Sequence, residues 1–242
     1  MIDIHMHVIP GVDDGAIDFD MACQMVDSAY LQGVRGIIAT PHSDSFICCV
    51  QDIHREFSKL SLWAAQKYPD LRLALGAEVY FSPYNTDDTL KALQKAAIPS
   101  LCASSFVLAE FSPYIDGRAM RTSLEKIIRA GWRPVIAHAE RCPDALEDAA
   151  LVSNLLSMGC LIQINAYSLA GERNPRILSL ARTLLARRQV HFLGSDAHRM
   201  NHRPPNVADG IRYISGHCPA DYAEAVLHKN AGQLFFSDAG AI

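Results

Sequence analysis

The stretch Ile2-Asp3-Ile4-His5-Met6-His7 ends a short apolar run with two histidines two positions apart. On a β-strand this spacing points both rings to the same face, where they can bind one metal ion. Such a pair alone would more often be two ordinary strand histidines. Three later segments also carry metal-ligand side chains after a short apolar run: Thr40-Pro41-His42, Ala137-His138-Ala139-Glu140-Arg141 and Ser195-Asp196-Ala197-His198. Together the four segments predict one metal centre assembled by most of the chain.

Short apolar runs recur along the chain and predict seven strands, most of them continuous, as expected for parallel strands covered by helices. The predicted strands are Ile2–His5, Gly36–Ala39, Arg72–Glu78, Phe106–Glu110, Val135–His138, Leu161–Asn165 and His191–Gly194. Helices are expected at residues 18–32, with Asp18 as N-cap, and at 120–130, 144–158, 175–189 and 219–228.

Polar residues end these strands at 7, 42, 78, 110, 138, 165 and 196, at intervals of about one strand–helix unit. This layout predicts an α/β fold, a distorted seven-stranded (β/α)7 TIM-like barrel with its metal site at the C-terminal strand ends. We expect a single domain over residues 1–242. The segment Ser43–Val50 is predicted to be a loop that could cover the site or contact the substrate.

The candidate ligands combine imidazoles and carboxylates. Asp14 lies in a Val-Asp-Asp-Gly stretch that could equally be a plain tight turn. Glu78 and Glu110 end apolar strands, where a carboxylate is costly to bury unless it is paired or metal-bound. The full set is His5, His7, Asp14, His42, Glu78, Glu110, His138, Asp196 and His198. Nine ligands predict two or three divalent ions, and imidazole and carboxylate ligands without thiolate suit manganese, iron or zinc better than calcium.

Two arginines follow the later motifs. Arg141 lies three residues after His138, and Arg203 lies five residues after His198. Either alone could be an ordinary surface arginine. Beside a metal cluster, both predict phosphate binding and stabilisation of the transferring group, because the guanidinium forms a two-pronged contact with phosphate. Asp3, on the same face as His5, is expected to orient the ligands.

Composition narrows the class of protein. The formal net charge is −4 without a basic stripe, which argues against nucleic acid as a partner. No signal peptide or membrane-spanning stretch is recognisable, so we expect a cytoplasmic protein without membrane insertion. Seven cysteines without a CxxC motif predict free thiols. Cys49 and Arg55 have the spacing of cysteine-dependent phosphatases, but no glycine lies between them, so we regard that match as chance.

The motifs as a set, with Asp13-Asp14-Gly15, Gly76-Ala77-Glu78, Glu110-Phe111 and Arg203-Pro204-Pro205, resemble the PHP (polymerase and histidinol phosphatase) superfamily. More narrowly, the chain resembles bacterial manganese-dependent protein-tyrosine phosphatases of the CpsB/YwqE type. Two positions depart from that pattern: Ala139 stands where proline is usual, and Arg199 where asparagine is common.

The resemblance implies a distorted barrel with three ions. His5, His7, Glu78 and Asp196 would hold the first ion, and Glu78, Glu110 and His138 the second. Asp14, His42 and His198 would hold the third. Arg141 and Arg203 match the family's phosphate-binding arginines. The implied substrate is phosphotyrosine in the tail of a bacterial tyrosine autokinase that controls capsular or exopolysaccharide synthesis.

The predicted reaction is hydrolysis of a phosphomonoester by a metal-bridging hydroxide. An aryl ester suits a site without an obvious general acid, because the phenolate leaving group has a pKa near ~10. The alternatives are a small-molecule phosphatase such as histidinol phosphatase and, from another class, a non-catalytic metal-binding interaction domain. The sequence does not determine the native metal, the cognate phosphoprotein or the oligomeric state.

Overall fold

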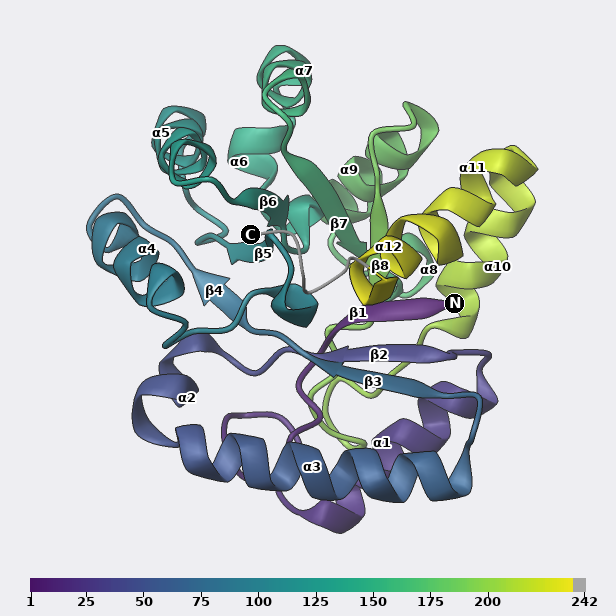
Figure 1. Ribbon diagram of the computed structural model, residues 1–242. Helices are drawn as coiled ribbons and strands as arrows, with labels where there is room; N and C mark the ends of the chain where they lie inside the picture. Colours follow the sequence, from purple (N-terminus) through teal and green to yellow (C-terminus); the bar gives the residue numbers. More distant parts are fainter. Residues whose placement is uncertain (237–242) are drawn as a thin grey trace.

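The computed structural model of the protein describes residues 1–236 (Figure 1). The predicted single domain extends to residue 242, and residues 237–242 lie outside the described part. Within it the strands are β1 (Ile2–Met6), β2 (Gly36–Ala39), β3 (Arg72–Leu75), β4 (Glu78–Tyr80), β5 (Phe106–Glu110), β6 (Arg133–Ile136), β7 (Leu161–Asn165) and β8 (Phe192–Gly194). They form a three-stranded sheet, β1-β2-β3, and a five-stranded sheet in the order β4 to β8. Every strand pair in both sheets is parallel.

Two short parallel contacts join the sheets at their ends. Met6 pairs with Ala197 just after β8, and the His5 carbonyl accepts a hydrogen bond from the Asp196 amide at 2.8 Å. On the other side His42, just after β2, pairs with Glu78 at the start of β4. The two sheets are therefore joined at both edges by single bridges, and the predicted α/β fold with parallel strands is confirmed.

The predicted strand Arg72–Glu78 is wrong as a single strand. The chain leaves β3 beside β2 and begins β4 beside β5, so the described part has eight strands rather than seven. Gly76 lies at the break, packed so closely that an added Cβ would come within 2.9 Å of a Leu101 methyl carbon. The break brings Glu78 from one sheet to the ligand position at the edge of the other.

Helices surround the strands (Figure 1), and most predicted helices are present. The α-helices are α1 (Phe19–Leu31), α2 (Ser43–Cys48), α3 (Val50–Lys67), α4 (Thr86–Gln94), α5 (Gly117–Arg129), α6 (Pro143–Leu146), α7 (Ala149–Ser157), α8 (Tyr167–Ala170), α9 (Pro175–Ala186), α10 (Ala208–His217), α11 (Ala220–Glu224) and α12 (Asn230–Phe236). A π-helical turn, Ala225–Lys229, joins α11 to α12. Asp18 caps α1 as predicted, accepting a hydrogen bond from the Met21 amide at 2.8 Å.

Two predictions about helices are wrong. Residues 144–158 form two helices, because the Asp148 side chain accepts hydrogen bonds from the amides of Ala150 and Leu151 and so begins α7 anew. The segment Ser43–Val50 is not a loop, since it forms α2 and the first residue of α3. The β2–α connection therefore presents a helix rather than a flexible loop beside His42.

The strands are buried on both faces, which explains their continuous apolar runs. Neighbouring residues of β2, Ile37 and Ile38, point to opposite faces and are both fully buried. Ile37 belongs to the larger apolar cluster, whereas Ile38 packs in a second one with Ile4 and Leu108. This two-sided packing fixes the strand ends, and with them the backbone that carries the candidate ligands.

Candidate metal centre

All nine candidate ligands lie together, eight of them in or after the C-terminal halves of strands and Glu78 at the start of β4. Four groups have ligand atoms within 4.8 Å of one another: His7, Asp14, His42 and His198; His5, His7 and Asp196; His5, Glu78 and His138; and His42, Glu78 and Glu110. The residues come from β1, β4 and β5 and from the turns that follow β1, β2, β6 and β8. The groups share members, as expected of one polynuclear centre rather than of separate sites.

Glu78 lies at the middle of the cluster and is 1% exposed. Its Oε1 lies 3.2 Å from His5 Nε2 and 2.8 Å from His138 Nε2, and its Oε2 lies 3.2 Å from His7 Nε2 and 3.1 Å from His42 Nδ1. Burial opposes ionisation, but attraction to His5 and hydrogen bonds with His138 and His42 hold the pKa of Glu78 well below its usual range. An ionised glutamate in this position can bridge two cations.

The donor set fits a metal ion. Asp13 lies 2.8 Å from His7 Nδ1, which places the proton of a neutral ring on that nitrogen. The lone pair of His7 Nε2 then faces a carboxylate oxygen of Glu78 at 3.2 Å and lies 3.3 Å from His5 Nε2. Two lone pairs at this distance repel unless a cation lies between them. Burial lowers the pKa of His7, but hydrogen bonds with Asp13 and Glu78 raise it well above the ordinary value, so this position favours a positive charge.

The outermost group contains Asp14, whose side chain is 64% exposed. Its Oδ1 lies 3.4 Å from both His42 Nε2 and His198 Nε2. These three residues are the set that the family resemblance implies for a third ion, and His7 joins them here. Glu110 lies farther from its neighbours, with 3.9 Å to His138 and 4.0 Å to His42.

Asp13 is a supporting residue that the sequence reasoning missed. Its Oδ2 is close to His7 Nδ1 and accepts a hydrogen bond from the His42 amide at 3.2 Å, while Oδ1 accepts from the Gly15 amide at 2.9 Å. Gly15 leaves no room for a side chain, because an added Cβ would lie 2.1 Å from the His7 carbonyl oxygen. The Asp13-Asp14-Gly15 motif thus supplies an orienting carboxylate, a candidate ligand and a residue without a side chain.

A second layer of polar side chains supports the other ligands. Gln163 Oε1 accepts a hydrogen bond from the His138 amide at 2.8 Å and lies 3.3 Å from His5 Nδ1. The side-chain amide of Asn165 donates a hydrogen bond to Asp196 at 2.9 Å, and its backbone amide donates one to the buried carboxylate of Glu140 at 3.0 Å. The sequence alone could have indicated the supporting role of Gln163, because a glutamine in the middle of an apolar strand needs a polar partner.

Asp3 does not orient a ligand ring, contrary to the prediction. Its Oδ1 accepts hydrogen bonds from the backbone amides of His5 at 3.2 Å and Ser195 at 2.9 Å. The carboxylate therefore holds the backbones of β1 and the residue after β8 together. It helps to fix where these two segments lie, whereas Asp13 and Gln163 contact the rings of His7 and His5.

Both predicted arginines reach the cluster. The Nη1 atoms of Arg141 and Arg203 lie 3.2 Å and 3.1 Å from Asp196 Oδ2. Burial raises the pKa of Asp196, but His5 and His138 lower it to about 2. A cavity of about 130 Å³ is lined by these two arginines and seven candidate ligands, all but His5 and His7, which lie deeper. The cavity is therefore lined by carboxylate and imidazole side chains together with two guanidinium groups.

Three of the seven non-glycine residues with positive φ in the described part of the chain line this cavity. His138, Asp196 and Arg203 have φ angles of 29°, 52° and 58°, in the region that non-glycine residues rarely adopt. Such conformations persist where surrounding contacts impose them, often at functional sites. Here the unusual backbone conformation occurs at three residues whose side chains line the cavity.

Arg199, the departure from the family pattern, has a defined role. Its Nε donates hydrogen bonds to the carbonyl oxygens of Asp14 and Gly15, both at 3.0 Å. The guanidinium therefore holds the loop that carries the exposed Asp14.

The two cysteines singled out in the sequence, Cys49 and Cys142, do not fit the role of a nucleophile for phosphate transfer. Arg55 lies within α3 and pairs with Asp52 and Glu56, so the Cys49–Arg55 segment is helical and forms no phosphate-cradling loop. Cys142, beside Arg141, is buried, and burial raises the pKa of its thiol to about 12. A thiol with that pKa stays protonated at neutral pH.

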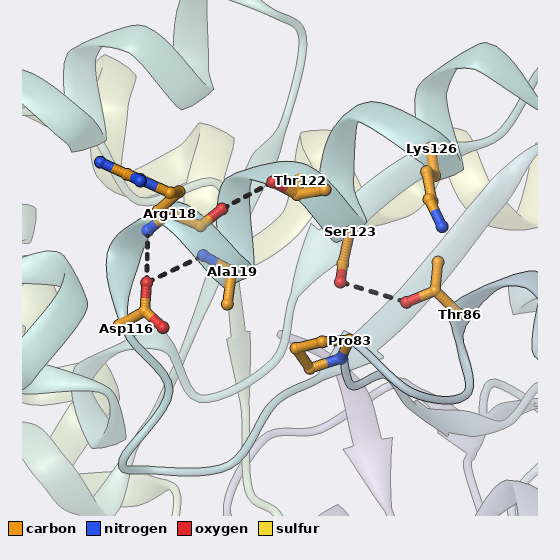
Figure 2. Close-up of a pocket in the computed structure, with 8 residues that line it drawn as sticks. All are labelled: Pro83, Thr86, Asp116, Arg118, Ala119, Thr122, Ser123 and Lys126. Carbon is orange, nitrogen blue, oxygen red and sulfur yellow. Dashed lines mark hydrogen bonds between the residues drawn. The ribbon is translucent and has the colours of Figure 1, made fainter.

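A second hollow, of about 230 Å³, lies between the β4–α4 connection and α5 (Figure 2). Figure 2 shows Ser123 hydrogen-bonded to Thr86 and Asp116 capping α5 through the amides of Arg118 and Ala119. No candidate ligand lines this hollow, so it is separate from the metal centre.

The chain also matches known proteins along almost its whole length. A family model described as capsular polysaccharide synthesis, CpsB/CapC, matches residues 1–236. The chain belongs to the CpsB/CapC family. The resemblance to CpsB/YwqE proteins is thus confirmed.

Two curated relatives and one solved structure illustrate the family. Tyrosine-protein phosphatase CpsB of Streptococcus pneumoniae is 38% identical over 242 residues, covering 97% of this chain and 98% of that protein. Tyrosine-protein phosphatase YwqE of Bacillus subtilis is 30% identical over 205 residues, covering 84% and 79%. A structure from the work on YwqE and CpsB, described as unique metal-dependent tyrosine phosphatases, superimposes with a TM-score of 0.85 at 27% identity, covering 97% of this chain and 94% of that chain.

Proposed function

We propose that this CpsB/CapC family member is a metal-dependent protein-tyrosine phosphatase. The observation that carries the proposal is the cavity in which seven candidate ligands and two arginines converge. Two guanidinium groups beside the candidate ligands suit two-pronged binding of a phosphoryl group. The names of the relatives, tyrosine-protein phosphatases, support the same activity.

We assign the ligands as the family resemblance implies. His5, His7, Glu78 and Asp196 would hold one ion, Glu78, Glu110 and His138 a second, and Asp14, His42 and His198 a third. Glu78, with imidazole nitrogens close to both of its oxygens, would bridge the first two. Imidazole and carboxylate ligands without thiolate suit manganese, iron or zinc, and we propose manganese because the chain resembles manganese-dependent phosphatases.

The chain's own residues then have distinct tasks. When bound, the ions supply positive charge and activate water for attack on phosphorus. Arg141 and Arg203, whose side chains are partly exposed, would exchange their contacts with Asp196 for the phosphoryl oxygens of the substrate. They would orient the group and stabilise the negative charge that develops on it. Arginine stays protonated at neutral pH and cannot protonate the leaving group, which favours an aryl ester.

We infer that the substrate is a phosphotyrosine-bearing protein, specifically the tail of a bacterial tyrosine kinase acting in capsular or exopolysaccharide synthesis. The family description, which names capsular polysaccharide synthesis, supports this assignment. We also propose a cytoplasmic location, which agrees with seven cysteines that are all free thiols. No helix within residues 1–236 is long and apolar enough to cross a membrane.

The test combines metal analysis with parallel assays. Purified protein is stripped with chelator, reloaded with Mn²⁺, Fe²⁺ or Zn²⁺, and assayed on a phosphotyrosine peptide and on histidinol phosphate. We expect no activity without metal, highest activity with Mn²⁺, and preference for the peptide. Activity that survives complete metal removal would contradict the mechanism, and preference for histidinol phosphate would contradict the substrate assignment.

A matched pair of variants separates metal loading from phosphate binding. Glu110→Gln keeps the size of a ligand but removes its charge, so the metal content is expected to fall together with activity. Arg141→Lys leaves every ligand in place, so metal content is expected to stay and activity to fall. If neither variant changes hydrolysis, while Glu110→Gln still loses metal, the centre is structural.

A further inference from the structure

Two loops next to the metal cavity carry the same four-residue sequence. Phe81-Ser82-Pro83-Tyr84 follows β4, and Phe111-Ser112-Pro113-Tyr114 follows β5. Because β4 and β5 pair in parallel with Tyr80 opposite Glu110, both copies begin at the same level of the sheet. Glu110 is a candidate metal ligand and directly precedes the second copy. The repeated sequence therefore lies at the C-terminal strand ends, beside the candidate site.

The two copies also have the same local contacts. The rings of Phe81 and Phe111 are buried, with centroids 6.3 Å apart. In each copy the serine Oγ accepts a hydrogen bond from the tyrosine amide at 3.3 Å. The phenylalanine and serine thus anchor each loop to the fold.

The tyrosines, in contrast, contribute little to that fold. The side chains of Tyr84 and Tyr114 are 98% and 86% exposed. Large rings in water on anchored loops are typical of surfaces that bind a partner, because they offer apolar area at a low entropic cost. The anchored loops keep both rings available in the absence of a ligand.

The second loop also reaches the segment of Arg141. Cys142, the next residue, donates a hydrogen bond from its Sγ to the Ser112 carbonyl oxygen at 3.7 Å. The loop that ends in Tyr114 therefore begins directly after Glu110 and contacts the residue next to Arg141, and both of these residues line the cavity. Tyr84 is on the neighbouring loop.

The lining of the cavity indicates what must lie outside it. Charged or imidazole side chains form the entire lining, which suits a phosphoryl group and not an aromatic ring. The aromatic ring of the substrate and its neighbours in the chain must then lie outside the cavity, and Glu110, which lines it, directly precedes the second repeated loop.

We propose that Tyr84 and Tyr114 form an aromatic rim that binds the phosphotyrosine-bearing segment of a polypeptide substrate. The proposal rests on the proposed function and names the residues that select its substrate. Pro83, which precedes Tyr84, also lines the second hollow beside α5 (Figure 2). The loop that carries Tyr84 therefore also borders this hollow, away from the metal cavity. An extended chain would cover it, whereas a small phosphate ester would contact the cavity alone.

The experiment measures steady-state kinetics of the manganese-loaded full chain. The substrates are a phosphotyrosine hexapeptide, the same peptide with phosphoserine, and phenyl phosphate. Tyr84→Ala and Tyr114→Ala are each expected to raise KM for the phosphotyrosine peptide about fivefold to tenfold with kcat retained. Tyr84→Phe and Tyr114→Phe are expected to keep KM, because the ring and not the hydroxyl makes the contact. Leu62→Ala, an exposed apolar residue on the outer helix α3, is the matched control.

A second readout does not depend on turnover. Binding of the hexapeptide with a non-hydrolysable phosphonate in place of the phosphate is followed by fluorescence anisotropy. The alanine variants are expected to weaken binding by the same factor as KM. If KM and affinity change less than twofold when Tyr84→Ala and Tyr114→Ala are combined, the proposal that these tyrosines bind the substrate is excluded. If peptide binding depends on the two tyrosines but the peptide is never hydrolysed, the binding role of the tyrosines is supported and the proposed phosphatase activity is contradicted.

Discussion

The orienting role of Asp13 can be tested with Asp13→Asn, which keeps the shape and removes the charge. One amide oxygen must replace two carboxylate oxygens that now serve three N–H groups. In either orientation the new NH₂ group faces a donor, the amide of Gly15 or the N–H groups of His7 and His42. His7 thereby loses the charge-assisted partner that keeps its Nε2 free for a metal ion.

The expected loss follows from that geometry. Removing a carboxylate behind a ligating histidine typically lowers metal affinity about 10- to 100-fold, which corresponds to about 1.4–2.7 kcal/mol. The metal-free protein should also lose about 1–3 kcal/mol of unfolding free energy, because a buried N–H group is left without an acceptor. Both effects arise from Asp13 alone.

Isothermal titration with Mn²⁺ and metal analysis after gel filtration measure the first quantity, and urea unfolding in chelator measures the second. Asp18→Asn is the control, because Asp18 only caps α1 and asparagine caps equally well. It should change neither quantity. Manganese affinity within threefold of the parent protein in Asp13→Asn would refute the reasoning that the carboxylate orients His7.

Three further predictions concern the backbone, the arginines and pH. Gly15→Ala should cost about 2 kcal/mol or more in denaturant unfolding, whereas Gly216→Ala, at an uncrowded position, should gain about 0.4–1 kcal/mol; equal effects would contradict the close approach to His7. Arg141→Lys should lower kcat/KM for a phosphotyrosine peptide about 100-fold at unchanged manganese content, and undiminished activity would exclude a role for its two-pronged contact. Burial lowers the pKa of His191, whose Nδ1 accepts a hydrogen bond from the Ile162 amide, so the unfolded chain takes up its proton more readily. The contribution of neutral His191 to the free energy of unfolding is fully present above its ordinary pKa of about 6.5 and is lost as the pH falls towards its pKa in the folded protein. In urea unfolding of metal-loaded protein between pH 7.5 and 5.5, the free energy of unfolding should therefore depend less on pH in His191→Gln than in the parent protein; equal pH dependence would contradict this role of His191.

The candidate ligands could be predicted from the sequence because each ends a segment with a recognisable pattern. An apolar run followed by His42, or ended by Glu110, shows both a strand and the residue at its end. Parallel strands in a barrel then bring such ends together whatever the helices between them do. The prediction of the site was therefore insensitive to errors in the connections.

The connections themselves were harder to predict. The break at Gly76 depends on packing against Leu101, which is distant in sequence and invisible to periodicity. Helix α3 did carry a signal, since Ile53, Leu60 and Ala64 repeat on one buried face. Asp13 was overlooked because its partner, His7, is reached only when the turn folds back onto β1. Local patterns therefore predicted strand ends well and tertiary partners poorly.

The contact between Asp3 and the Ser195 amide joins residues 192 positions apart. On a ribosome that adds about 5–20 residues per second, roughly 10–40 s separate the synthesis of His5 from that of His198. The proposed ligands Glu78, Glu110 and His138 are made before residue 139, whereas Asp196 and His198 come near the end of the chain. Two of the three proposed ions therefore lack a ligand until almost all of the chain has emerged, and we expect their uptake to mark the end of folding. A polypeptide stalled before residue 195 lacks the Ser195 amide that joins Asp3 to the end of β8, so it should bind fewer ions than the complete chain.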